Sequence, residues 1–142
     1  MQRRLETLGL LARLQDEALS EQAQALTELQ QQAAALTAEQ GELARRRHEA
    51  GTVTMPEAMA YRGTFLAALR RENDRINTQL AQLDSEVDRQ RDSVLESYQA
   101  LRANEQLQEI IRAQARTEAA RSEQGASDEA GTQGYLRAAR RR

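Results

Sequence analysis

Apolar residues recur at alternating steps of three and four between Met59 and Ile111, and mostly polar or charged residues fill the positions between them. A repeat of about 3.5 residues over several heptads is typical of a coiled coil, because slight underwinding keeps one stripe of the helix against its partner. The pattern therefore predicts a long amphipathic helix. Its stripe comprises Met59, Arg62, Leu66, Leu69, Asn73, Ile76, Leu80, Leu83, Val87, Gln90, Val94, Ser97, Leu101, Asn104, Gln108 and Ile111.

A second run with the same spacing extends from about Arg3 to Ala50 and predicts another long helix. Gly9 and Gly41 weaken this run by about 1 kcal/mol each relative to Ala, without changing its period. The stripe of this helix comprises Leu5, Leu8, Ala12, Gln15, Leu19, Gln22, Leu26, Leu29, Ala33, Leu36, Gln40, Leu43, Arg47 and Ala50.

The segment between the two runs has the features of one helix end followed by one helix start. Gly51 suits a helix C-terminus in the left-handed backbone conformation. Thr54 and Glu57 have the spacing of a capping box, and Pro56 falls in the first helical turn, where its missing N–H costs nothing. Two long helices joined by so short a loop are expected to lie antiparallel.

A turn centred in the early fifties also predicts the register of the hairpin. It places Gln15 opposite Gln90, and a slip would bury either amide against an aliphatic side chain at a cost of about 1–3 kcal/mol. We predict that these two residues help to fix the register, although both amides could instead turn to solvent. The register pairs Leu36 with Leu69, Leu29 with Ile76, Leu26 with Leu80, Leu19 with Val87, Ala12 with Val94 and Leu5 with Leu101, and leaves Gln22, Gln40, Arg47 and Asn73 poorly matched.

The two helices are unequal in this register, because helix one is exhausted near Leu101. The amphipathic pattern continues through Leu107, Ile110, Ile111, Ala115 and Ala119, which leaves roughly twenty residues, or about 30 Å, of helix without a partner in the chain. The segment after it is rich in Gly and polar residues and is expected to be disordered.

The sequence therefore predicts an all-α fold, a long antiparallel two-helix coiled-coil hairpin with unequal arms, helix two being longer. The expected ranges are helix one at about 3–50, a turn at 51–55, helix two at about 56–122 and a flexible tail at 123–142.

Composition supports a helical rod and narrows the function. Aromatic residues make up 3% of the chain and charged residues 30%, which suits long helices better than a globular core. There is no Cys, and no apolar run approaches the roughly 20 residues that span a bilayer, so a cytoplasmic location is expected. No phosphate-binding loop, nucleophile motif or zinc motif occurs, and the lone His48 lies in a charged run. We expect no enzyme activity, no metal and no cofactor.

Seven arginines gather near the predicted hairpin end and raise the alternative of a nucleic-acid-binding arm. Stacking aromatics are scarce, however, and acidic residues dilute the cluster, so a protein-facing or solvated surface is favoured and no nucleic-acid partner is expected. The cluster comprises Arg45, Arg46, Arg47, Arg62, Arg70, Arg71 and Arg75, with Glu49, Glu57, Glu72 and Asp74 among them.

With these features in place, the chain resembles the FliJ/YscO proteins of flagellar and type III secretion export machinery. The similarity covers most of the length. It rests on the Leu-rich first helix, on the segment Tyr61–Leu69 that opens helix two, on Leu101–Glu105, and on Glu118–Glu129, which is similar to the family's Glu-Gln…Asp-Glu element.

The resemblance implies a non-enzymatic stalk similar to the two-helix part of a rotary-ATPase γ subunit. Such proteins dock their termini in the pore of a hexameric export ATPase, point the hairpin end at an export-gate protein and assist export chaperones. They lie in the cytoplasm and reach the inner membrane only through the apparatus. The alternatives are a self-associating scaffold that pairs through the unpartnered stripe, or the nucleic-acid-binding arm.

Two sets of contact residues follow from the resemblance. The gate stripe carries over onto Phe65, Leu69, Glu72 and Ile76. Thr64 looks inserted before Phe65, relative to the family pattern. The seam pattern also places Leu69 and Ile76 between the helices, so Phe65 and Glu72 are the better candidates for exposed contacts. For the ATPase ring, the residues expected near the termini are Arg3, Arg4, Leu107, Ile110, Ile111, Arg112, Ala115 and Arg116.

Overall fold

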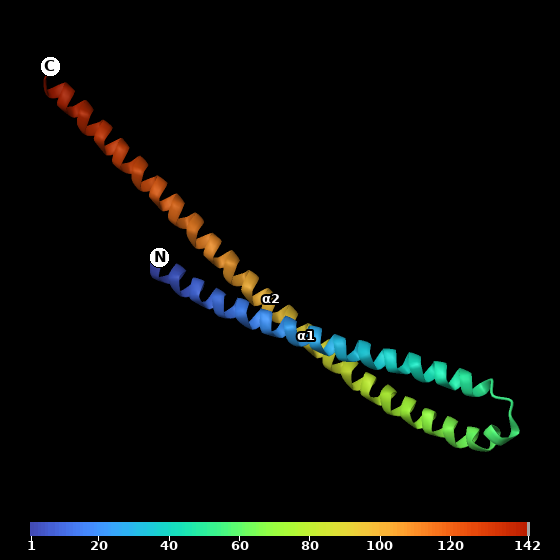
Figure 1. Cartoon of the computed structure of the whole chain (residues 1–142). Coiled ribbons are helices and arrows are strands. Elements are labelled where there is room, and N and C mark those ends of the chain that lie inside the picture. The colour runs from blue at the N-terminus through green and yellow to red at the C-terminus, as the bar shows by residue number, and fades with distance from the viewer. Residues whose placement is uncertain (142) are drawn as a thin grey trace. The chain divides into compact units, whose positions relative to one another are not determined.

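The computed structural model describes residues 1–141 and consists of two helices, α1 (Gln2–Gly51) and α2 (Pro56–Arg140), shown in Figure 1. No strand occurs among the described residues. The chain is an all-α hairpin in which helix two is longer than helix one, which confirms the predicted fold class. The described helices contain no segment that is both long and apolar enough to cross a membrane.

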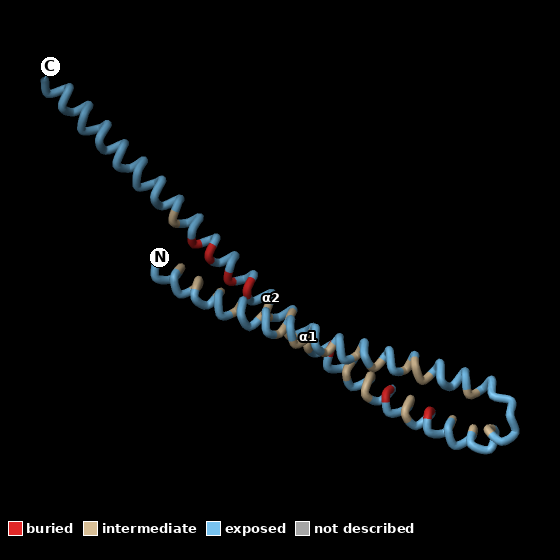
Figure 2. Tube along the Cα trace, viewed as in Figure 1, coloured by how far each residue is buried: buried red, intermediate tan, exposed pale blue. Residues whose placement is uncertain are grey.

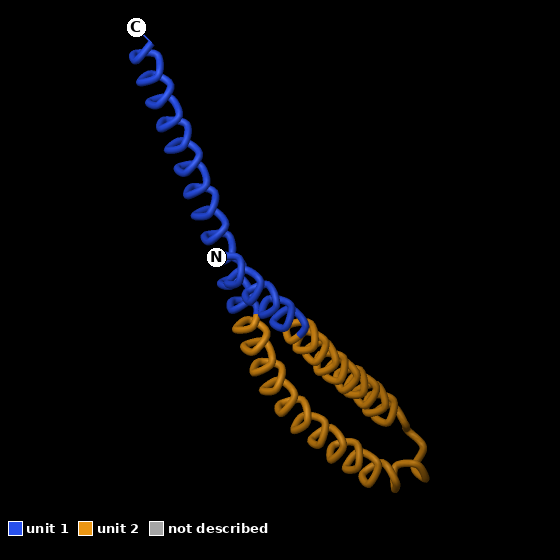
Figure 3. Tube along the Cα trace, turned by 90° about the vertical axis from the view of Figure 1, so that its left-hand side faces the viewer, with its two compact units in different colours: residues 1–17, 98–142 blue, residues 18–97 orange. Residues whose placement is uncertain are grey.

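The chain divides into two compact units, and each unit contains a part of both helices (Figure 3). We refer to residues 18–97 as the loop unit, since it contains the connection between the helices, and to residues 1–17 with 98–142 as the terminal unit.

Burial follows the predicted stripes in both units (Figure 2). In α1, every stripe position from Leu5 to Leu43 is half-buried, and the residues between them are mostly exposed. In α2, the buried apolar side chains all belong to the predicted stripe. They are Leu69, Ile76 and Val87 in the loop unit and Leu101 and Ile111 in the terminal unit. Only Arg47 and Met59 of the two stripes are exposed, and both lie near the connection.

The register of the loop unit differs from the predicted one. Gln90 Nε2 donates to the backbone carbonyl of Gln22 at 3.0 Å, and Ser97 Oγ donates to the Gln22 side chain at 2.6 Å. Gln40 donates in the same way to the side chain of Asn77. The pairing of Gln90 with Gln15 is therefore wrong. The observed register gives Gln22 and Gln40 the polar partners that the predicted register denied them, which avoids leaving their amides unsatisfied in the seam.

The terminal unit is held together by a buried amide cluster of Asn104 and Gln108. Asn104 Nδ2 donates to the carbonyl of Leu8 and to Oε1 of Gln15, both at 3.1 Å. Gln108 Nε2 donates to Oδ1 of Asn104 at 2.7 Å and to the Leu8 carbonyl at 3.3 Å. These bonds place the beginning of α1 beside residues well beyond Leu101. The prediction that the pairing with helix one ends near Leu101 is therefore wrong, because α1 also pairs with residues 104 and 108 of α2.

The end of α1 corrects a second prediction. No described glycine has a positive φ, so Gly51 does not adopt the left-handed conformation. Thr52 closes the helix instead, because its N–H and its hydroxyl both donate to the Glu49 carbonyl, at 3.1 and 2.8 Å. This uses a side chain to satisfy a carbonyl that the helix end leaves free.

The C-terminal boundary of α2 corrects a third prediction. The helix continues to Arg140, so the boundary at 122 and the predicted disordered tail at 123–142 are wrong for residues 123–140. Ala, Glu, Gln and Arg fill most of these positions, and their helix propensity offsets the cost of Gly125, Gly131 and Gly134. Every residue from 116 to 141 is exposed, so no other part of the terminal unit covers this segment.

Candidate protein-interaction sites

Exposed apolar side chains gather around the connection between the helices, and we call this set the hairpin-end surface. Tyr61 is 77% exposed and Phe65 45% exposed, and Val53, Met55 and Met59 are exposed beside them in the sequence. Val53, Tyr61 and Phe65 line one shallow groove of about 380 Å³. Large apolar side chains left in water favour contact with another protein.

The structure separates the four residues predicted to contact an export gate. Phe65 belongs to the hairpin-end surface, whereas Leu69 and Ile76 are buried in the seam and cannot offer their side chains while the helices are paired. Glu72 is half-buried and pairs with Arg75. Phe65 is therefore the one apolar side chain of the four that is available to a partner.

The seam pattern does not predict most of the hairpin-end surface. Val53 and Met55 lie in the connection, and the seam pattern includes Met59. A heptad pattern says nothing about residues outside the helices, and it assigns the first turn of α2 to the seam although Met59 is 49% exposed. The usable signal is the density of Met and aromatic residues within thirteen positions, from Val53 to Phe65.

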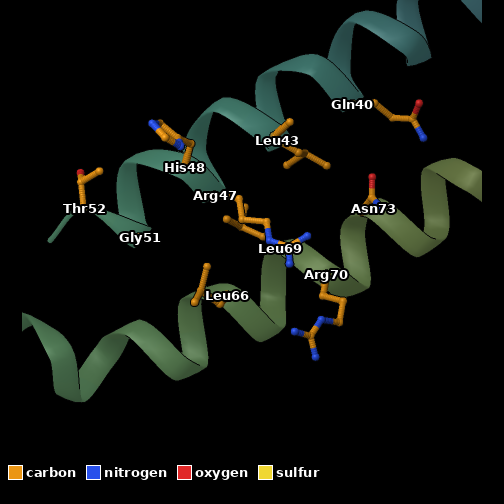
Figure 4. A pocket seen from close by; sticks show the side chains of 11 residues that line it. Gln40, Leu43, Arg47, His48, Gly51, Thr52, Leu66, Leu69, Arg70 and Asn73 are labelled. Atoms are coloured by element: carbon orange, nitrogen blue, oxygen red, sulfur yellow. The ribbon is translucent and has the colours of Figure 1, made fainter.

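A second groove of the loop unit lies between α1 and α2 and has a volume of about 630 Å³ (Figure 4). Leu43, Leu66 and Leu69 supply apolar lining. Arg47 extends from α1 toward α2, whereas Arg70 extends from α2 away from α1 (Figure 4). The two helices therefore do not close against each other here, and a guanidinium group occupies the opening.

Other arginines near the hairpin end are already paired with carboxylates of their own helix. Arg45 donates to Glu42 at 2.6 and 3.0 Å and also pairs with Glu49. The hydrogen bonds from Arg45 lower the pKa of the Glu42 carboxyl to about 2. The hydrogen bond from Arg75 likewise lowers the pKa of Glu72. These pairs are exposed and contribute little stability, but they keep both carboxylates charged and occupied at neutral pH.

The terminal unit carries the residues predicted to contact an ATPase ring. Arg3, Arg4 and Leu107 line a shallow groove of about 290 Å³. Ile110 is exposed beside this region, whereas Ile111 is buried in the seam.

The remaining predicted ring contacts lie further along α2. Arg112 and Arg116 are exposed, and Ala115 is half-buried. Arg112 donates to Gln108 Oε1 at 3.3 Å. The terminal unit also exposes three leucines that the prediction missed, because they lie off the seam repeat of α1. These are Leu10, Leu11 and Leu14.

The described grooves and exposed apolar side chains are candidate contact surfaces. Within residues 1–141, no group of three or more His, Cys, Asp or Glu side chains could hold a metal ion. Apolar and arginine side chains line each of the three grooves, together with a few other polar residues such as Asn73 in the groove of about 630 Å³ and Glu49 in the groove of about 380 Å³. The fold is thus a coiled-coil hairpin that carries exposed apolar side chains in both units.

Comparison with known proteins identifies the family to which the chain belongs. The family model described as the flagellar FliJ protein matches residues 1–140. The chain therefore belongs to the FliJ family and is a component of the flagellar or type III export apparatus. Neither a curated protein nor a solved structure matches it.

Proposed function

We propose that this protein is the stalk that couples the hexameric export ATPase to the export gate and assists export chaperones. The observation that carries the proposal is the family match over residues 1–140, together with a separate exposed apolar surface in each of the two units. A coupling protein needs two binding surfaces that different partners can occupy at once. In this proposal the protein works in the cytoplasm, at the inner-membrane export apparatus.

The terminal unit is the proposed ATPase-binding part. Leu107 and Ile110 offer exposed apolar side chains, and Arg3, Arg4 and Arg116 offer unburied charges near them in the sequence or in the groove. The helix beyond position 115 supports the same assignment, because a single exposed helix of this length gains little stability in water without a partner. A ring pore would cover it on all sides.

The loop unit is the proposed gate-binding part. Its hairpin-end surface leaves five large apolar side chains in water, among them Tyr61 and Phe65. A partner that buries an aromatic side chain gains about 1.5–3 kcal/mol per residue. The buried Leu69 and Ile76 then act by holding the surface in place and do not contact the gate.

Association with the export ATPase tests the proposal. We expect the full chain to co-elute with the hexameric ATPase and to change its rate of ATP hydrolysis or its oligomerisation. The double substitution Leu107→Asp and Ile110→Asp should weaken this association by about tenfold or more, because it places two charges in an apolar contact. Leu95→Asp, at an exposed position of the loop unit, is the matched control and should bind normally. Lack of both co-elution and any effect on hydrolysis would contradict the proposal.

Self-association is a second candidate, favoured by the exposed Leu10, Leu11 and Leu14 of the terminal unit. Sedimentation over a range of concentrations separates the two. A monomer whose sedimentation does not depend on concentration argues against a self-associating scaffold.

A further inference from the structure

Two arginines occupy seam positions at the hairpin end, where a coiled coil ordinarily places apolar residues. Arg47 belongs to the stripe of α1 and Arg62 to the stripe of α2. Arg62 is half-buried, and its Nη2 lies 4.0 Å from the position that a Cβ on Gly51 would take. Gly51 is about one helical turn beyond Arg47 in α1. Arg62 therefore lies near the same end of α1 as Arg47.

Neither guanidinium has an acceptor within the described chain. Arg47 and Arg62 make no side-chain hydrogen bond and no ion pair with any residue from 1 to 141, in contrast to Arg45, Arg46 and Arg75. Arg47 is exposed and Arg62 is half-buried, so neither guanidinium is withdrawn from water. Their N–H groups therefore remain available to carboxylates of another molecule.

The opening between the helices coincides with Arg47. The groove of about 630 Å³ is lined by Arg47 together with Leu43, Leu66 and Leu69, so a charge and an apolar floor lie side by side (Figure 4). Arg62 lines the neighbouring groove of about 380 Å³ with Tyr61 and Phe65. Each groove therefore combines a free guanidinium with apolar lining.

The charge of this region favours an anionic occupant. Residues 45–75 contain seven arginines against four acidic residues, and two of those acids, Glu49 and Glu72, are already paired with arginines of their own helix. A nucleic acid could pair its phosphates with the arginines, but it would leave the leucine side chains of the groove without an apolar partner. The region also lacks a row of aromatic side chains on which bases could stack. A peptide that carries both carboxylates and apolar side chains uses both kinds of lining.

We infer that the two grooves of the loop unit form a docking site for an acidic, amphipathic segment of a partner protein. Its Asp or Glu carboxylates pair with Arg47 and Arg62 in the bidentate geometry that guanidinium groups favour, and its apolar side chains rest on Leu66 and Phe65. The inference rests on the proposed function in one respect, that the hairpin end meets a protein partner. It adds the chemistry by which that partner is recognised.

Binding of model peptides to the full chain tests the inference. A fluorescent amphipathic helical peptide of Leu and Glu is titrated with the protein and followed by anisotropy, beside the same peptide with Gln in place of Glu. We expect the Glu peptide to bind and the Gln peptide to bind about tenfold more weakly or not at all. Added salt should weaken the Glu complex, because screening acts on its ion pairs.

Substitution of the two seam arginines locates the site. The double variant Arg47→Gln and Arg62→Gln should lower the affinity for the Glu peptide by about tenfold. Its melting temperature should stay nearly the same, because neither arginine is buried or paired within the described chain. The matched control is Arg13→Gln with Arg121→Gln, two exposed arginines of the terminal unit, and it should bind the peptide as the unaltered chain does.

Three results would overturn the inference. They are equal binding of the two peptides, no effect of the double variant, and tighter binding of single-stranded RNA or of phosphatidylserine vesicles than of the Glu peptide. Failure here is distinguishable from failure of the proposed function. Loss of peptide recognition with normal ATPase association refutes the docking site alone, whereas normal peptide binding without ATPase association refutes the stalk.

Discussion

Replacing Ile76 by Ala is expected to lower the free energy of unfolding of the hairpin by about 2–4 kcal/mol. Ile76 is 0% exposed and is the largest fully buried side chain of the described residues. The substitution removes apolar contacts and leaves a cavity that a two-helix seam cannot fill from a second layer. Urea unfolding followed by far-ultraviolet circular dichroism measures the change.

The control for this prediction is Leu95→Ala. Leu95 lies in the same unit and helix but is 53% exposed, so its truncation should change the free energy of unfolding by less than about 0.5 kcal/mol. Equal effects of the two substitutions would show that Ile76 does not occupy the core.

Replacing Ile111 by Asp is expected to detach the beginning of α1 from α2 in the terminal unit. Ile111 is 4% exposed, so the change would bury an unpaired carboxylate at a cost of several kcal/mol. The amide cluster of Asn104 and Gln108 lies next to it and should open as well. Amide hydrogen exchange in the first seventeen residues measures the opening, because detached helix exchanges faster.

Ile110 provides the matched control, since it is the adjacent residue, has the same side chain and is 55% exposed. Ile110→Asp should leave exchange in the first seventeen residues unchanged. If both substitutions left it unchanged, Ile111 would be unpartnered as the sequence alone had predicted, and the register of the terminal unit would be wrong.

The residues that form the two seams were predictable, because they depend only on the period of the apolar residues along each helix. A spacing of about 3.5 residues places Leu5 through Leu43 on one face of α1 and Leu66 through Ile111 on one face of α2, whatever the relative position of the helices. The position of the connection was predictable for a similar reason, since Pro56 can begin a helix but cannot lie inside one without breaking it.

The register was not predictable from period, because a seam of repeating leucines accepts several alignments at similar energy. Its choice depends on polar residues that must find each other, here Gln22 with Gln90 and Gln40 with Asn77. The predicted register pairs Gln15 with Gln90 but leaves other polar seam residues, such as Gln22 and Gln40, without a polar partner. The polar residues of the seam therefore determine the register more than the position of the turn does.

The exposure of the candidate contact residues was predictable only in part. Phe65, Leu107 and Ile110 are exposed as expected for contact residues, but Leu69, Ile76 and Ile111 are in the core. Family likeness assigns a contact to a helical stripe, whereas exposure depends on which face of that stripe the other helix covers. The seam arginines were visible in the sequence as seam positions, but their lack of acceptors emerged only from the side-chain contacts.

Site-specific cross-linking inside the assembled export apparatus tests the stalk most directly. A photoreactive residue is placed either at Arg116 in the terminal unit or at Tyr61 in the hairpin-end surface, both of which are exposed. We expect position 116 to cross-link to the export ATPase and position 61 to the export gate. Cross-links in the opposite sense, or cross-links from both positions to another copy of this chain alone, would contradict it.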